Sequence, residues 1–237
     1  MHKGFIPKIS LLQHTMEQTH EKGMDSLLAQ IVKKSLEVEL GQQIIKKIES
    51  RLSEKFGSDL YDAVLNFQKI DLVLREFYGK GADGLEKKIL KNLFEVHVPK
   101  QGKKDKEHFP MVILKDQSTS EIILNVIGDY DVRRILNILT KNKEKQNIDS
   151  MTKQDIIEST SMSQTAGYAK IDSMIKCGLL EIKQYGESKI DKRRVAKYQT
   201  AFKNLNVNVT SSGDVNVNLY VDDETIKKST ILSVIGY

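Results

Sequence analysis

The sequence predicts a mainly α-helical protein with a small β component, and three patterns support this prediction. Apolar residues recur every three or four positions from Leu27 to Leu52, as they do on long amphipathic helices. Two shorter helical segments flank the polar link Ser159–Ser161, and apolar residues alternate with polar ones in 180–185 and 205–221. With 237 residues, the chain is long enough for about two domains.

The first domain is expected to be helical and to cover residues 27–96, after a polar tail or frayed helix at 1–26. Further helices are expected at 66–78 and 84–96. Between them, Gly79–Gly84 matches the letters of the dinucleotide-binding pattern G-x-G-x-x-G. That motif requires a preceding strand, whereas here a helix precedes it and a lysine-rich stretch follows. A glycine-rich turn between two helices is therefore the favoured interpretation.

A charged segment at 97–118 is predicted to link this domain to the next. Residues 97–109 contain Pro99, Gly102 and several lysines, and they show no apolar period. Met111–Leu114 is apolar, and its pattern leaves strand and helix open. The second domain then covers residues 119–237.

The centre of the second domain is a pair of short helices followed by a hairpin. Thr152 can cap the first helix, Ser163 can cap the second, and Gly178 can end it. An alternating strand follows at 180–185, and the basic segment 189–198 supplies the return strand. Helix, turn, helix and hairpin in this order predict a winged helix-turn-helix.

Two parts of the chain resemble known families. The segments Gly41–Gly57 and Phe77–Phe94, the second with its Phe-Tyr-Gly-Lys-Gly-Ala turn, resemble a small helical output domain common in ammonia-oxidising archaea. This resemblance covers about residues 27–96. It implies an archaeal source and a regulatory setting, and it leaves open an unknown ligand or protein partner at this domain.

The second domain resembles the ArsR-type winged-helix regulators over about residues 119–237. The matching parts are Glu121–Leu139, Ser163-Gln164-Thr165 and Gly178-Leu179-Leu180. Two alternating runs joined by Ser211–Asp214 predict an added β-hairpin and are similar to archaeal members. The resemblance implies a transcriptional regulator that binds double-stranded DNA.

The chain departs from that family at three points. It lacks the Cys-x-Cys signature of the metal-responsive members, so it is not expected to sense metals through thiolates. Gly167 replaces a frequent core valine, and Ala169 replaces a frequent arginine of the recognition helix. A base contact by arginine is therefore absent at position 169.

The candidate DNA-binding residues lie on the second short helix and on the hairpin. Gln164 can pair with adenine, Thr165 can contact a thymine methyl group, and Tyr168 can reach a phosphate. The basic residues of the hairpin suit the phosphate backbone or the minor groove. The complete set is Ser163, Gln164, Thr165, Tyr168, Lys170, Lys183, Lys189, Lys192, Arg193, Arg194 and Lys197. The alternative is a winged-helix module for protein interaction, with the same charges serving only as a solvated surface.

The amino-acid composition narrows the functional classes to which the protein can belong. The net charge is +5, and residues 129–202 hold 14 basic and 10 acidic side chains, which suits a polyanionic partner. The single cysteine excludes an internal disulfide and a multi-cysteine zinc site. No catalytic motif is present, so neither enzyme activity nor a cofactor or metal is expected. Without a signal peptide or a long apolar run, a cytoplasmic protein that does not enter membranes is expected.

A homodimer is also expected, because a single winged helix buries little DNA surface and its relatives bind two half-sites. The predicted dimer contacts are the apolar segment 121–127 and the terminal segment 224–235. A monomer would expose the apolar residues of the terminal segment.

Overall fold

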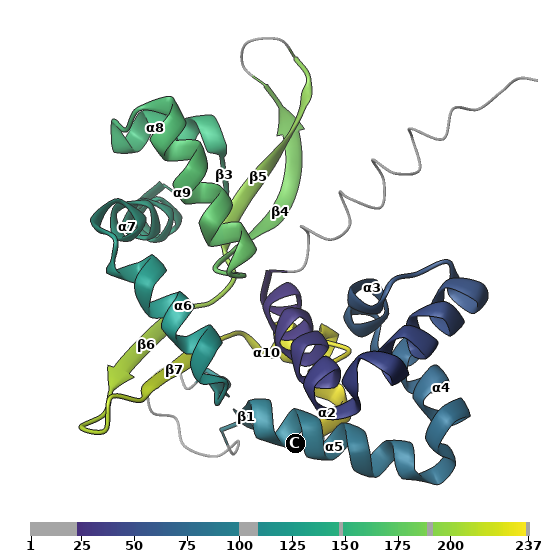
Figure 1. Ribbon diagram of the computed structural model, residues 1–237. Coiled ribbons are helices and arrows are strands. Elements are labelled where there is room, and N and C mark those ends of the chain that lie inside the picture. Colours follow the sequence, from purple (N-terminus) through teal and green to yellow (C-terminus); the bar gives the residue numbers. More distant parts are fainter. Residues whose placement is uncertain (1–22, 100–108, 147–148, 189–191, 236–237) are drawn as a thin grey trace, which may run out of the picture.

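The computed structural model describes residues 23–99, 109–146, 149–188 and 192–235. This part of the chain is mainly α-helical and contains two antiparallel sheets (Figure 1). The coarse prediction of fold class is therefore confirmed. The predicted tail falls almost wholly on residues 1–22, outside the described residues.

The N-terminal half is built from helices, as predicted. They are α2 (Gly23–Phe56), α3 (Leu60–Leu65), α4 (Phe67–Tyr78), the short 3-10 helix η1 (Gly79–Gly81) and α5 (Ala82–Leu93). The long α2 is kinked at Gly41, whose φ of 74° and ψ of 159° are non-helical. Gly79, at φ 56°, ends α4 and begins the turn into α5, so the glycine-rich segment is a helix-to-helix turn.

A four-stranded sheet joins the two halves; its β6–β7 hairpin was predicted, but the pairing of that hairpin with two further strands was not. Its strands are β1 (Phe94–His97), β2 (Met111–Leu114), β6 (Asn204–Val209) and β7 (Val215–Tyr220), in the order β1-β2-β7-β6. Leu114 pairs with Phe94 on one side and with Val217 on the other. The predicted helix 84–96 thus ends at Leu93, and the predicted linker 97–118 contains β2 and the start of the next helix.

The C-terminal half contains the helix pair and the second sheet. Its elements are α6 (Gln117–Gly128), α7 (Tyr130–Gln146), β3 (Met151–Thr152), α8 (Lys153–Thr160), α9 (Gln164–Lys176), β4 (Leu180–Glu187) and β5 (Arg194–Thr200). The sheet order is β3-β5-β4, and the β4–β5 hairpin extends beyond α8 and α9 (Figure 1). The predicted order of helix, turn, helix and hairpin is present.

The C-terminal segment returns to the N-terminal helices. It comprises α10 (Asp223–Lys228) and α11 (Leu232–Ile235), and α11 packs on α5. Thr230 Oγ1 donates to the Leu65 carbonyl at 2.9 Å, and the Phe67 amide donates to Thr230 Oγ1 at 3.3 Å. Ile226 and Leu232 are buried. The prediction that a monomer exposes the apolar residues of this segment is therefore wrong for Ile226 and Leu232, which pack within the same chain.

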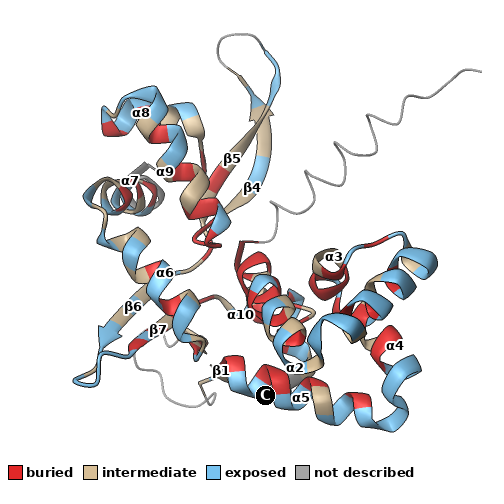
Figure 2. Ribbon diagram, in the orientation of Figure 1, coloured by how far each residue is buried: buried red, intermediate tan, exposed pale blue. Residues whose placement is uncertain are grey.

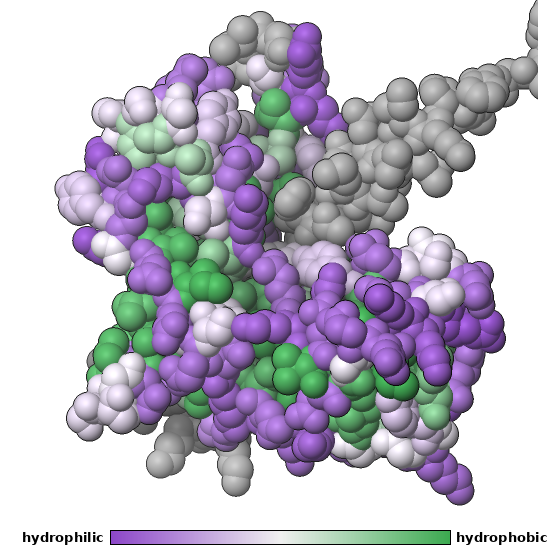
Figure 3. Space-filling model, viewed as in Figure 1, coloured by the Kyte–Doolittle hydropathy of each residue, from purple (hydrophilic) through white to green (hydrophobic). Residues whose placement is uncertain are grey.

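One hydrophobic cluster runs through both halves. Figure 2 shows buried residues on the inner faces of α2, α4, α5 and α9, while the outer faces are exposed. Figure 3 shows a largely hydrophilic surface over the N-terminal helices and more hydrophobic residues around α6. On α6, Ile123 is fully buried whereas Ile122 is 50% exposed. Among the helices that the structure describes, none is long and apolar enough to cross a membrane.

Candidate nucleic-acid interface

Side-chain caps define the starts of α8 and α9, as predicted. Thr152 Oγ1 accepts from the Asp155 amide at 3.1 Å, and the Asp155 carboxylate accepts from the Thr152 amide at 3.2 Å. This reciprocal arrangement is a capping box. Ser163 Oγ accepts from the Ala166 amide at 3.4 Å and caps α9. The turn between the helices contains Ser161 in the left-handed region at φ 54°.

Gly167 allows α8 and α9 to approach each other closely. A Cβ atom at this position would lie 2.5 Å from Cγ1 of Ile157 on α8, closer than side chains tolerate. Ile157 thus fills the space that a larger residue at position 167 would take. This packing gives a physical reason for Gly167, where the family that the second domain resembles often has a valine.

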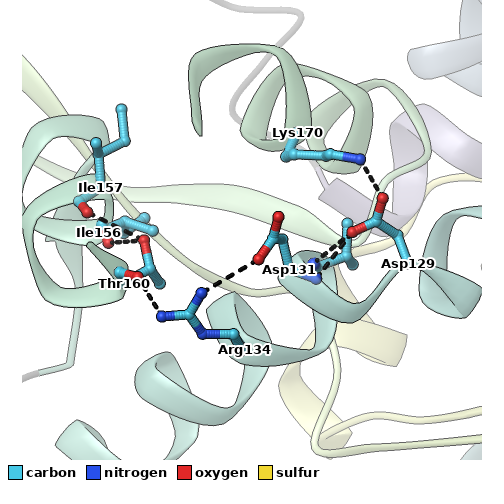
Figure 4. A network of polar contacts seen from close by, with 8 residues as sticks. Asp129, Asp131, Arg134, Ile156, Ile157, Thr160 and Lys170 are labelled. Atoms are coloured by element: carbon cyan, nitrogen blue, oxygen red, sulfur yellow. Dashed lines mark hydrogen bonds and ion pairs between the residues drawn. The ribbon is translucent and has the colours of Figure 1, made fainter. Parts of the chain in front are cut away.

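An ion pair fixes α9 against the junction of α6 and α7 (Figure 4). Lys170 Nζ donates to Asp129 Oδ2, and Asp129 Oδ1 accepts from the Asp131 amide at 2.8 Å and the Val132 amide at 3.3 Å. The hydrogen bond from Lys170 is the main cause that holds the pKa of Asp129 below its usual range. Lys170 therefore contacts protein in this structure, whereas the sequence placed it among the residues that bind DNA.

A second polar contact joins α7 to the turn after α8. Arg134 donates to the Thr160 carbonyl and, at 3.2 Å, to Asp131 Oδ1 (Figure 4). The Thr160 hydroxyl lies 2.8 Å from the Ile156 carbonyl and is fully buried. These bonds satisfy polar groups at the end of α8 and hold the helix pair in place.

The predicted recognition residues form an exposed polar surface at the start of α9. Ser163, Gln164 and Thr165 are exposed, and Tyr168, one turn further on, is 42% exposed. Ala169 is also exposed, and its methyl group cannot make the base contact of the arginine that the resembled family often has there. These side chains project from the N-terminal end of the helix, where backbone N–H groups also point outward.

The β4–β5 hairpin brings basic residues beside this helix. Arg194 lies over the ring of Tyr185, with 3.8 Å between the guanidinium carbon and the ring centroid. The Ser188 amide donates to the Arg193 carbonyl at 2.8 Å. Lys192 lies in this turn and has a φ of 58°. Lys183, Lys192, Arg193 and Arg194 are exposed, and Lys197 is partly buried. Lys189 lies outside the described residues.

A cavity of about 400 Å³, which the sequence analysis did not predict, lies between α8, α9 and the hairpin. Tyr168, Val195 and Tyr198 contribute to its lining. The charged residues of the lining are the acidic Asp155, Glu158 and Glu187 and the basic Lys153 and Lys197. The small acidic excess disfavours a phosphate at this spot, while the aromatic rings offer an apolar surface. Cys177 lies elsewhere, at the end of α9, and burial raises the pKa of its thiol.

Comparison with the models of known protein families, with curated proteins and with solved structures finds no match for this chain.

Proposed function

We propose that residues 119–221 form a winged helix-turn-helix of the ArsR-like kind, and that the protein is a DNA-binding transcriptional regulator. In this proposal α9 enters the major groove and the β4–β5 hairpin contacts the backbone. The observation that carries it is the exposed run Ser163–Thr165 at the capped start of α9, beside a hairpin with several exposed basic residues. Hydroxyl and amide groups of this kind hydrogen-bond base edges, and arginine and lysine bind phosphates.

The packing around α9 supports this role. The Lys170–Asp129 ion pair and the close contact at Gly167 hold the helix on its inner side. Its outer side then needs no rearrangement to meet a groove, which lowers the ordering cost of binding. Lys170 is not a DNA contact in this proposal, because it pairs with Asp129. The hairpin residues Lys192 and Arg194 remain DNA contacts.

One observation favours a second candidate, a winged-helix module that binds protein. Tyr168 faces a partly apolar cavity that Glu158 and Glu187 border. A peptide with a basic and an apolar side chain would suit that lining better than a phosphate would.

A gel-shift experiment with random-sequence duplex DNA separates the two candidates. The full chain is expected to retard the duplex at low salt and to release it as salt rises. A chain that leaves the duplex unshifted at low salt and tens of micromolar protein would support the protein-binding module instead.

We further infer a homodimer in which α6 and the start of α7 supply the contact. Ile122 is 50% exposed and Tyr130 is 68% exposed, so both side chains are accessible to a second copy of the chain. The segment 224–235 is left out of this dimer contact, because its Ile226 and Leu232 are buried within the chain. Light scattering of the full chain at tens of micromolar tests it: a dimeric mass supports the proposal, and a monomeric mass refutes it.

A further inference from the structure

A cluster of three carboxylates lies between α4 and α5, away from the proposed DNA-binding surface. Asp71 comes from α4, and Asp83 and Glu86 come from the first turns of α5. One oxygen of each carboxylate lies within 4.8 Å of the others. Asp83 and Glu86 are three positions apart, so the helix itself places them on one side.

Glu86 is the unusual member of the cluster because it is buried. The residue is only 5% exposed, and its Oε1 atom has no hydrogen-bond partner in the described structure. Burying a carboxylate oxygen without a partner is costly, so such an atom calls for a ligand.

The buried carboxylate borders a cavity of about 390 Å³ that the C-terminal segment helps to close. Asp71, Asp83, Thr230 and Ser233 line the same cavity. The helix α11 of that segment packs on α5. The site therefore combines acidic residues of two helices with hydroxyl groups from a segment more than a hundred residues away in the sequence.

We propose that Asp71, Asp83 and Glu86 bind a hard divalent cation such as Ca²⁺ in this cavity. All three donors are carboxylate oxygens, which Ca²⁺ and Mn²⁺ prefer over softer ligands. Two ligands on opposite sides of a Ca²⁺ ion lie roughly 4.6 to 5.2 Å apart, so the observed spread of the oxygens needs little adjustment. Thr230, Ser233 and water would complete the shell.

Arg75 competes with the cation for the same carboxylates. Its Nε donates to Asp71 at 2.8 Å, and its NH2 group donates to Asp83. The side chain of Arg75 is 45% exposed, so it can turn towards solvent when a cation binds. The one positive charge of Arg75 balances part of the cluster, whereas a divalent cation supplies two charges and can also reach Glu86.

Calorimetric titration of the metal-free full chain with Ca²⁺, and separately with Mn²⁺, tests the proposal. One equivalent of at least one of these ions is expected to bind. Glu86→Gln keeps the shape of the side chain but removes a charged ligand, so it should weaken affinity by about tenfold or more. Asp83→Asn, at a more exposed position of the cluster, should weaken it in the same direction. Arg75→Ala removes the competing charge and should strengthen binding several-fold.

Glu121→Gln on α6 is the matched control, because it makes the same chemical change on an exposed helix face outside the cluster. Its affinity for the cation should equal that of the native chain. Thermal unfolding adds a second readout, since the cation should raise the Tm of the native chain and of Glu121→Gln by more than that of Glu86→Gln. Three results would each overturn the proposal: no binding up to about 5 mM of either ion, unchanged affinity in Glu86→Gln and Asp83→Asn, or weaker binding in Arg75→Ala.

Discussion

The two β-hairpins of the C-terminal half share an antiparallel form but differ in charge. The β4–β5 hairpin carries Lys183, Arg194 and Lys197, with Lys192 and Arg193 at its turn. The β6–β7 hairpin from 204 to 220 contains no lysine or arginine, and four of its exposed strand positions are asparagines, Asn204, Asn206, Asn208 and Asn216. Basic charge is thus concentrated on the hairpin beside α9, and the other hairpin is an internal control for it.

The glycine turn that precedes β4 and the glycine turn within the β6–β7 hairpin also differ in the space around them. Gly178, which leads into β4, has φ +66°, and a Cβ there would lie 2.6 Å from the Gly23 carbonyl oxygen of α2. Gly213, in the β6–β7 turn, has φ +89° and nothing within 4 Å of such a Cβ. Gly178 therefore meets both a backbone restriction and a steric one, whereas Gly213 meets only the first.

The largest expected effect follows from this difference and concerns stability. Gly213→Ala should lower the free energy of unfolding by about 1 kcal/mol, the usual cost of a left-handed conformation with a Cβ atom. Gly178→Ala should lower it by about 3 kcal/mol, because backbone must also move. Urea unfolding of the two variants measures both values, and equal losses would show that the contact between Gly178 and α2 is not tight.

The next effect tests the charge difference on DNA. Replacing both Arg193 and Arg194 by Ala removes up to two phosphate contacts and should weaken affinity for duplex DNA roughly thirtyfold at physiological salt. The matched double variant Asn206→Ala and Asn208→Ala changes two exposed residues of the other hairpin and should leave affinity unchanged. Fluorescence anisotropy measures both, and circular dichroism checks that each variant is folded. Similar losses in the two variants would remove the distinction between the hairpins.

A smaller effect is expected from the proposed base contact of Gln164. Gln164→Ala should lose roughly 1 to 2 kcal/mol of binding free energy on a site selected from random DNA, and little on unselected DNA. Gln154→Ala on α8 is the control, because the side chain of Gln154 donates to Glu158 at 2.9 Å within the same helix. Equal losses on both kinds of DNA would assign Gln164 to the backbone.

The smallest effect concerns the ion pair that holds α9. Asp129→Asn should lower the free energy of unfolding by about 1 kcal/mol or less at neutral pH, because the pair is partly exposed. The folded chain holds the pKa of Asp129 below its usual value. The stabilisation is therefore present above the unfolded pKa of about 3.9 and is lost as pH falls through the folded pKa. Urea unfolding of both chains at pH values falling from about 7 should show the difference shrink once the pH falls below the unfolded pKa of Asp129. A difference that persists there would point to packing rather than charge.

Local patterns in the sequence predicted the local structure well. Thr152 and Ser163 cap the helices that they were expected to cap. These signals succeed because a cap acts within three or four residues along the chain. The β6–β7 hairpin was predicted for the same reason, since its turn at Ser211–Asp214 separates two alternating strands.

The features that the sequence did not predict depend on contacts between distant residues. β2 pairs with β1 and β7, and neither partner is visible in the four residues Met111–Leu114. Glu86 looks like an ordinary exposed helix residue until α4 and the segment around Thr230 cover it. Lys170 could be placed on the correct helix, but its partner Asp129 lies 41 positions away. Burial and pairing of this kind are set by tertiary packing rather than by local propensity.

Chemical-shift mapping of the full chain with duplex DNA tests the central claim most directly, because it reports each hairpin separately. On addition of DNA, the amide chemical shifts of residues 163–168 and 192–197 are expected to change, and those of residues 204–209 and 215–220 are expected to stay constant within noise. The shifts should fade as salt rises, since phosphate contacts release counterions. Shifts confined to β6 and β7, or no shifts in either hairpin at low salt, would contradict the assignment of α9 and the β4–β5 hairpin to DNA binding.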